Sequence, residues 1–166
     1  MCGNNMKNLI FILTIIFFCS CGGSNESTFK LDPSMPVEIG IESLKKNSEG
    51  VDVMNVYMIN HQPVSGIQFE IEPKGFFEVD SVYGGRSEIN NFQLHNNKTG
   101  RILGFSMSGK SIPESTSLEK LDNILFLVSG KFLQPLNSTI TISPIIASST
   151  AQKMDYKSIP FVVIGN

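Results

Sequence analysis

Apolar and polar residues alternate along Val64–Glu72 (VSGIQFEIE), and this pattern constrains the fold more than any other feature of the chain. The apolar set is Ile67, Phe69 and Ile71, and the polar set is Gln68, Glu70 and Glu72. A period of two residues is typical of a β-strand with one buried face. Residues 101–108 (RILGFSMS) also alternate, so we expect both stretches to lie in one sheet, with Phe69 and Phe105 in the core.

The rest of the chain also has the sequence pattern of short β-strands. Short stretches rich in Val and Ile are separated by Gly, Pro and Asn, and no long segment has clean helical periodicity. The pattern predicts an all-β fold, a single β-sandwich of about nine strands within residues 37–166. The expected strands are 37–44, 51–59, 64–72, 76–83, 92–95, 101–108, 121–128, 139–146 and 159–164.

The first residues are typical of an export signal. Residues 9–18 (LIFILTIIFF) follow Lys7, and ten residues rise only about 15 Å as a helix, half the thickness of a bilayer. Residues 1–20 therefore indicate a signal peptide. Ser20-Cys21 resembles the processing site of a bacterial lipoprotein, which implies lipidation of Cys21 and a polar linker over residues 21–36. Cys19 fits this pattern less well, and an ordinary secretory cleavage is the alternative.

Export and lipidation define the expected location and the available chemistry. We expect a lipid-anchored protein of the bacterial cell envelope, on the outer membrane or the cell surface. Of the three cysteines, cleavage before Cys21 removes two and lipid occupies the third, which leaves no disulfide, no Cys-ligated metal and no cysteine nucleophile. The mature chain has 12 basic and 15 acidic residues without long charged runs, which argues against nucleic-acid binding.

Three patterns bear on catalysis, and each has a simpler structural interpretation. Residues 104–111 (GFSMSGKS) match the phosphate-binding loop pattern, but Phe105 and Met107 alternate like a strand and Pro113 would interrupt the required helix. If the strands around Pro73 form a hairpin, four carboxylates share an outer surface: Glu70, Glu72, Glu78 and Asp80. A solvated sheet face explains these carboxylates, and His61 and His95 lack the partners of a triad or zinc site. We therefore expect no catalytic residue, metal, nucleotide or cofactor.

Three longer patterns resemble the cohesin domain. Residues 66–82 (GIQFEIEPKGFFEVDSV) are similar to two cohesin strands joined by a short turn. Residues 102–130 resemble that family's strand, Gly-x-x-Ile-Pro loop and following strand, and residues 141–166 resemble its closing strands. The resemblance implies a jelly-roll sandwich that binds a protein partner, as cohesins bind dockerins. In cohesins the two alternating strands contact the partner, which implies a binding surface of Gln68, Glu70, Gly104 and Ser106.

The leading hypothesis is therefore a non-catalytic, membrane-anchored module that binds a protein. The alternative is a carbohydrate-binding module that serves the attachment or uptake of polysaccharide, because cohesins and several such modules share one fold. The chain has no Trp and only three Tyr, which weakens the case for an aromatic sugar platform. If the implied surface is correct, replacing Gln68 and Ser106 together with Arg should block a protein partner while preserving the fold.

Overall fold

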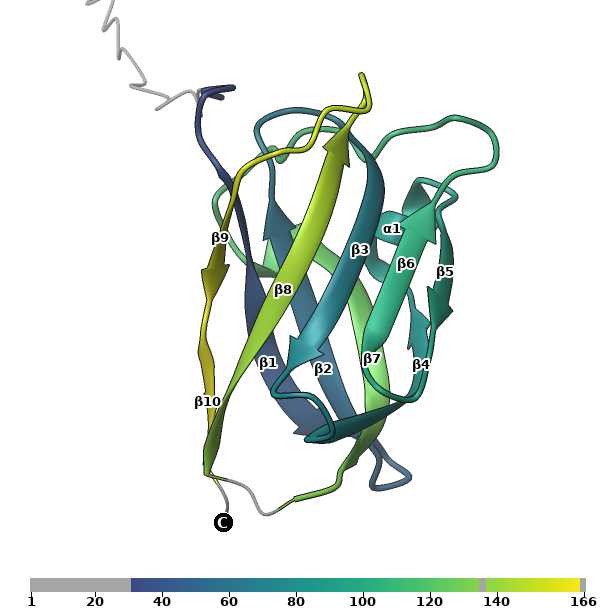
Figure 1. Cartoon of the computed structure of the whole chain (residues 1–166), viewed down its shortest axis with the longest axis vertical. Coiled ribbons are helices and arrows are strands. Elements are labelled where there is room, and N and C mark those ends of the chain that lie inside the picture. Colours follow the sequence, from purple (N-terminus) through teal and green to yellow (C-terminus); the bar gives the residue numbers. More distant parts are fainter. Residues whose placement is uncertain (1–30, 135–136, 165–166) are drawn as a thin grey trace, which may run out of the picture.

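Two five-stranded sheets stack face to face in the computed structural model, which describes residues 31–134 and 137–164 (Figure 1). The first sheet has the strand order β4-β7-β2-β1-β9, and the second has the order β10-β8-β3-β6-β5. All pairs are antiparallel except β1 and β9, which run parallel. In Figure 1 the second sheet lies in front of the first.

The strand bounds are as follows. The first sheet contains β1 (Val37–Lys46), β2 (Asp52–Ile59), β4 (Phe77–Tyr83), β7 (Ile124–Phe132) and β9 (Tyr156–Ile159). The second sheet contains β3 (Val64–Glu72), β5 (Gln93–Asn96), β6 (Arg101–Phe105), β8 (Ser138–Ser148) and β10 (Phe161–Val163). Two short helical elements connect strands, the helix α1 (Gly85–Ile89) and the 3-10 turn η1 (Leu121–Asn123).

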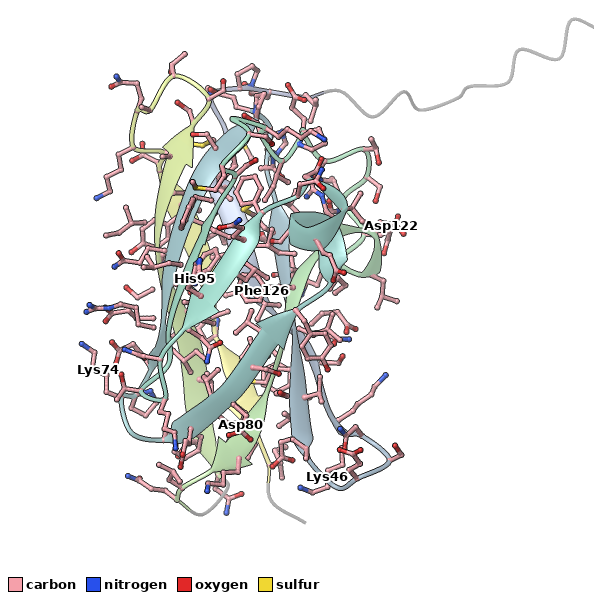
Figure 2. All side chains as sticks on the ribbon, turned by 90° about the vertical axis from the view of Figure 1, so that its right-hand side faces the viewer. Lys46, Lys74, Asp80, His95, Asp122 and Phe126 are labelled. Atoms are coloured by element: carbon pink, nitrogen blue, oxygen red, sulfur yellow. The ribbon has the colours of Figure 1, made fainter. Side chains whose placement is uncertain are left out.

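The core fills the space between the two sheets. Most strands contribute apolar alternate residues, and the rings of Phe69 and Phe126 lie with their centroids 5.4 Å apart across this space. Figure 2 shows Phe126 in the interior of the sandwich. The central strands are β2, between β1 and β7, and β3, between β8 and β6, and neither has an exposed residue. Burial of this apolar surface is the main favourable contribution to folding.

The predicted β-sandwich is confirmed, with ten strands in the described residues where the sequence predicted about nine. The difference arises at the last expected strand, 159–164. Pro160 lacks an N–H group and interrupts the strand, so β9 pairs with β1 in the first sheet and β10 pairs with β8 in the second. Figure 1 shows this segment along one edge of the sandwich.

The predicted faces are correct for β3 and wrong for β6. Ile67, Phe69 and Ile71 are buried, as expected. On β6, however, Gly104 faces the core and Phe105 points outward. A Cβ at position 104 would lie 2.6 Å from Cγ1 of Ile67, so the missing side chain provides the space that Ile67 occupies.

The expected hairpin at Pro73 is also absent. β3 belongs to the second sheet and β4 to the first, so the turn carries the chain from one sheet to the other. Phe76 and Phe77 follow the turn and are both buried, which places the start of β4 on the core between the sheets.

The amino-terminal assignments lie largely outside the described residues. The predicted signal peptide (1–20), the lipidation site Cys21 and most of the predicted linker (21–36) fall in residues 1–30, and they remain predictions. Within residues 31–134 and 137–164, no helix is long and apolar enough to cross a membrane.

Candidate functional site

One side of the sandwich carries a four-stranded surface, which we call the outer face. Figure 1 shows the four strands β8, β3, β6 and β5 side by side in the second sheet. The outer face is formed by their side chains that point away from the core. Cross-strand pairing arranges them in rows, because Gln68 of β3 lies opposite Ile145 on one side and Leu103 on the other. The outer face consists of Thr141, Ser143, Ile145, Ala147, Gly66, Gln68, Glu70, Glu72, Arg101, Leu103, Phe105, Gln93 and His95.

Three large apolar side chains are exposed on the outer face. Ile145, Leu103 and Phe105 have relative exposures of 53%, 40% and 39%, and we call them the apolar strip. His95 of β5 stacks on Phe105, with ring centroids 5.6 Å apart and planes inclined by 19°. Exposed apolar groups gathered on one sheet face are a feature of interaction surfaces.

Ionic contacts join the strands at one end of the outer face. Arg101 of β6 lies opposite Glu70 of β3, and its Nη2 is 2.7 Å from Oε1 of that carboxylate. Lys74, in the turn after β3, places its Nζ 3.0 Å from Oε2 of Glu70. Hydrogen bonds from Lys74 and then Arg101 hold the pKa of the Glu70 carboxyl below its usual value. The outer face therefore combines three exposed apolar side chains with a charged end.

The structure brings together only part of the predicted binding surface. Gln68 and Glu70 point outward, as expected, and are partly exposed. Gly104 faces the core and cannot present a side chain to a partner. Ser106 follows the last residue of β6 and is half-buried, with its hydroxyl 3.0 Å from that of Ser108. Whether these residues bind a partner stays a prediction.

Leu103 and Phe105 were missed because they were expected in the core. Their alternation with Ile102 and Gly104 was visible in the sequence, but it did not indicate which set is buried. The signal that could have found them is the glycine, because a Gly opposite a large residue of the neighbouring strand marks a crowded side of the sheet.

The four carboxylates that were expected to share a surface are divided between the sheets. Glu70 and Glu72 lie on β3, whereas Glu78 and Asp80 lie on β4. Glu78 has its own partners, Lys98 and Lys131, each with Nζ 3.4 Å from a carboxylate oxygen. In the part of the chain that the structure describes, no three His, Cys, Asp or Glu side chains gather in a way that could hold a metal ion.

The segment that matches the phosphate-binding pattern has a strand and turn conformation. Gly104 and Phe105 end β6, and the described residues 106–120 contain no helix. Ile112, close after the pattern, forms a β-bridge with Val64 at the start of β3. The geometry that such a motif requires, a glycine-rich loop leading into a helix, is therefore missing at this place.

A second polar cluster lies away from the outer face and was not anticipated from the sequence. Arg86 of α1 donates hydrogen bonds from Nη1 to the backbone oxygen of Met58, at 2.9 Å, and to Oδ1 of Asn60, at 3.0 Å. Further acceptors are Ser115, Asn123 and the backbone oxygen of Pro113. These are all neutral oxygen atoms, and they link α1 to β2 and to the loop before β7. The cluster therefore positions loops.

Comparison with known proteins supports the fold alone. No protein-family model matches the chain, and no curated protein does. A crystal structure of the CaDoc0917–CaCohA2 complex contains a chain with 14% identity and a TM-score of 0.52, covering 77% of this chain and 99% of that one. A non-cellulosomal cohesin from the hyperthermophilic archaeon Archaeoglobus fulgidus has 15% identity and a TM-score of 0.52, covering 79% and 93%. The sandwich therefore has a cohesin-like fold.

Proposed function

We propose that this chain is a non-catalytic binding module that docks a protein partner on its outer face. The observation that carries the proposal is the apolar strip, with Ile145, Leu103 and Phe105 exposed on one sheet face beside a charged end. Apolar anchors surrounded by polar groups are the usual composition of a protein interface. One structure with a similar fold is itself a complex, which supports the same reading.

The proposal includes an anchor to the cell envelope. The Ser20-Cys21 sequence follows an apolar run and precedes a polar segment, and β1 begins at Val37. A lipid on Cys21 would hold the sandwich at a bacterial membrane through a short tether. The outer face would then meet partners that are displayed at the same surface or that diffuse past it.

A carbohydrate ligand is the second candidate, and one observation favours it. Phe105 and His95 form a stacked pair on the outer face, and the Phe105 side chain is 39% exposed. An exposed ring could pack against the apolar face of a sugar. The protein hypothesis explains more of the surface, because Ile145 and Leu103 extend the apolar area beyond this pair.

The two candidates can be separated by affinity capture with the full-length chain. The bait variant Gln68→Arg/Leu103→Arg adds two charges to the middle of the outer face. The matched control is Ser48→Arg in the turn between β1 and β2, which is exposed and distant in the topology. We expect wild type and the control to retain the same protein from a membrane extract, and the double variant to lose it.

Two results would argue against a protein partner at this face. Equal retention of that protein by the double variant would place the site elsewhere on the molecule. Retention of soluble polysaccharide by wild type, lost when Phe105 is changed to Ser, would favour the carbohydrate candidate. Thermal unfolding of each variant must first show that the fold is intact.

A further inference from the structure

A small hollow lies at the charged end of the outer face. It has a volume of about 160 Å³ and forms where the turn after β3 meets the turn between β5 and β6. Its lining residues are all polar: Glu70, Lys74, Asn97, Thr99 and Arg101. A neighbouring hollow shares Asn97 and Arg101 and is also lined by His95 and Leu103 of the outer face. The polar hollow therefore continues directly into the apolar strip.

Both oxygens of the Glu70 carboxylate already have cationic partners. Its Oε1 accepts a hydrogen bond from Nε of Arg101 at 2.9 Å and lies 2.7 Å from Nη2 of the same guanidinium, and its Oε2 lies 3.0 Å from Nζ of Lys74. Nη1 of Arg101 and the remaining ammonium protons of Lys74 have no acceptor among the described residues. Both side chains are more than half exposed, at 54% and 65%, so they can reach an incoming group.

Asn97 adds a further donor. Its Oδ1 accepts hydrogen bonds from the hydroxyl of Thr99 and from the backbone N–H of Arg101, both at 2.9 Å. These contacts fix the amide orientation, because the oxygen must face the turn. The NH₂ group of Asn97 then has no acceptor in residues 31–134 and 137–164. The hollow therefore presents unused hydrogen-bond donors from Arg101, Lys74 and Asn97. Its one carboxylate, that of Glu70, is already paired.

The charges of the lining residues also favour an anionic group in the hollow. Lys74 and Arg101 contribute two positive charges and Glu70 one negative charge, which leaves an excess of one positive charge in the lining. Glu72 is not part of the lining and accepts a hydrogen bond from the backbone N–H of Lys74. Lys98 lies in the same turn as Asn97, and its Nζ is 3.4 Å from Oε1 of Glu78. One additional carboxylate would balance the lining and satisfy its free donors.

We propose that this hollow is a specificity pocket that takes an aspartate or glutamate side chain of the protein partner. The inference rests on the proposed function, because it assumes that the partner covers the outer face. Arg101 and Leu103 are two residues apart on the same side of β6, so the acidic residue would sit beside the apolar anchors. The partner surface would combine apolar side chains with an acidic residue at one end.

The test selects binders from a displayed library of a small helical scaffold with randomised surface positions, using the full-length chain as target. Clones that no longer bind the Leu103→Arg variant define the set that uses the outer face. In this set we expect enrichment of Asp or Glu at one position, and binding to Arg101→Gln that is weaker by about tenfold or more. Arg101→Lys, which keeps the charge but loses the planar fork, should weaken binding less.

Matched controls make the outcomes decisive. Lys131→Gln removes a lysine of β7 in the other sheet that also pairs with a glutamate, and it should leave binding unchanged. Suppose that the Leu103-dependent clones show no acidic enrichment and bind Arg101→Gln as tightly as wild type. The proposal of an acidic-residue pocket is then wrong, whereas the proposal that a protein docks on the outer face is still supported. If no clone depends on Leu103, both proposals fail. Unchanged melting temperatures for the variants exclude unfolding as the cause.

Discussion

Phe69 and Phe105 occupy the opposite sides of neighbouring strands, and their environments differ accordingly. Phe69 of β3 is 1% exposed and contacts the ring of Phe126 from the other sheet. Phe105 of β6 is 39% exposed and stacks on His95. A side chain in the core contributes through packing, whereas one on the outer face is free to contact another molecule.

This contrast predicts different costs of truncation. Phe69→Ala should lower the free energy of unfolding by about 3–5 kcal/mol, because it removes a buried ring and leaves a cavity. Phe105→Ala should cost no more than about 1 kcal/mol, since much of the ring is already in water. Denaturant unfolding of both variants checks this difference, and equal costs would mean that the face of β6 is assigned wrongly.

The same pair shows what the sequence can reveal at the residue scale. Alternation over residues 101–108 predicts a strand correctly, but it leaves two choices of face. The larger apolar set is normally the buried one, and here it is exposed. Ile67, which is distant in the sequence, determines which face of β6 is buried, because its side chain fills the space above Gly104. Such long-range packing is not visible in a local pattern.

At the scale of elements, Arg86 ties three separate segments together. Its guanidinium is the shared donor for acceptors on β2, in the loop around Ser115 and on η1. Burial lowers the pKa of Arg86, and the surrounding oxygens satisfy its N–H groups. Asn60 and Ser115 are almost completely buried, so their polar atoms depend on these contacts.

We therefore predict that Arg86→Met destabilises the chain by about 2–4 kcal/mol, because several buried acceptors lose their donor. The effect should be strongest near the loop, where the amide of Ser115 donates to the backbone oxygen of Asn60 over 2.8 Å. Amide hydrogen exchange at Ser115 should accelerate more than exchange at Phe69 in β3. Uniform acceleration would show that the cluster does not act locally.

Two glutamates bridge neighbouring elements and make the stability depend on pH. Lys74 and Arg101 lower the pKa of Glu70, and Lys98 and Lys131 lower the pKa of Glu78, each from an ordinary value of 4.5. An acid with a lowered pKa in the folded state stabilises the fold above its unfolded pKa. This stabilisation is lost as the pH falls through the lowered pKa.

The melting temperature should therefore fall as the pH is lowered below about 4.5. The double variant Glu70→Gln/Glu78→Gln should show a smaller fall, because it lacks the two titrating groups. Scanning calorimetry between neutral pH and pH 3, which is more than one unit below the unfolded pKa of Glu, measures both falls in melting temperature. If the melting temperatures of wild type and the double variant fall equally with pH, these ion pairs do not contribute to the pH dependence of stability.

Most elements could be predicted from local pattern, and their connections could not. The bounds of β3 match the predicted strand, because alternation is strong and turn residues flank it. The turn at Pro73 was expected to form a hairpin, yet it leads to the other sheet. A hairpin and a connection between the sheets both need a short turn. Burial of Phe76 and Phe77 between the sheets favours the connection.

At the scale of the whole molecule, the proposed anchor determines where the outer face can act. If Cys21 carries the lipid, Cys21→Ser should abolish labelling with palmitate and leave the chain unprocessed or released from the membrane. Cys19→Ser serves as the matched control and should retain the label. Labelling that persists in Cys21→Ser would move the modification to another residue or exclude it.

We propose that a protein partner docks on the outer face. Photocrosslinking in the producing cells tests it most directly, with a photoreactive phenylalanine derivative in place of Leu103 or of Asp80. Leu103 is 40% exposed on the outer face, and Asp80 is exposed on β4 of the other sheet. We expect a protein adduct of defined mass from position 103 and none from position 80. An adduct from position 80 with none from position 103 would contradict it.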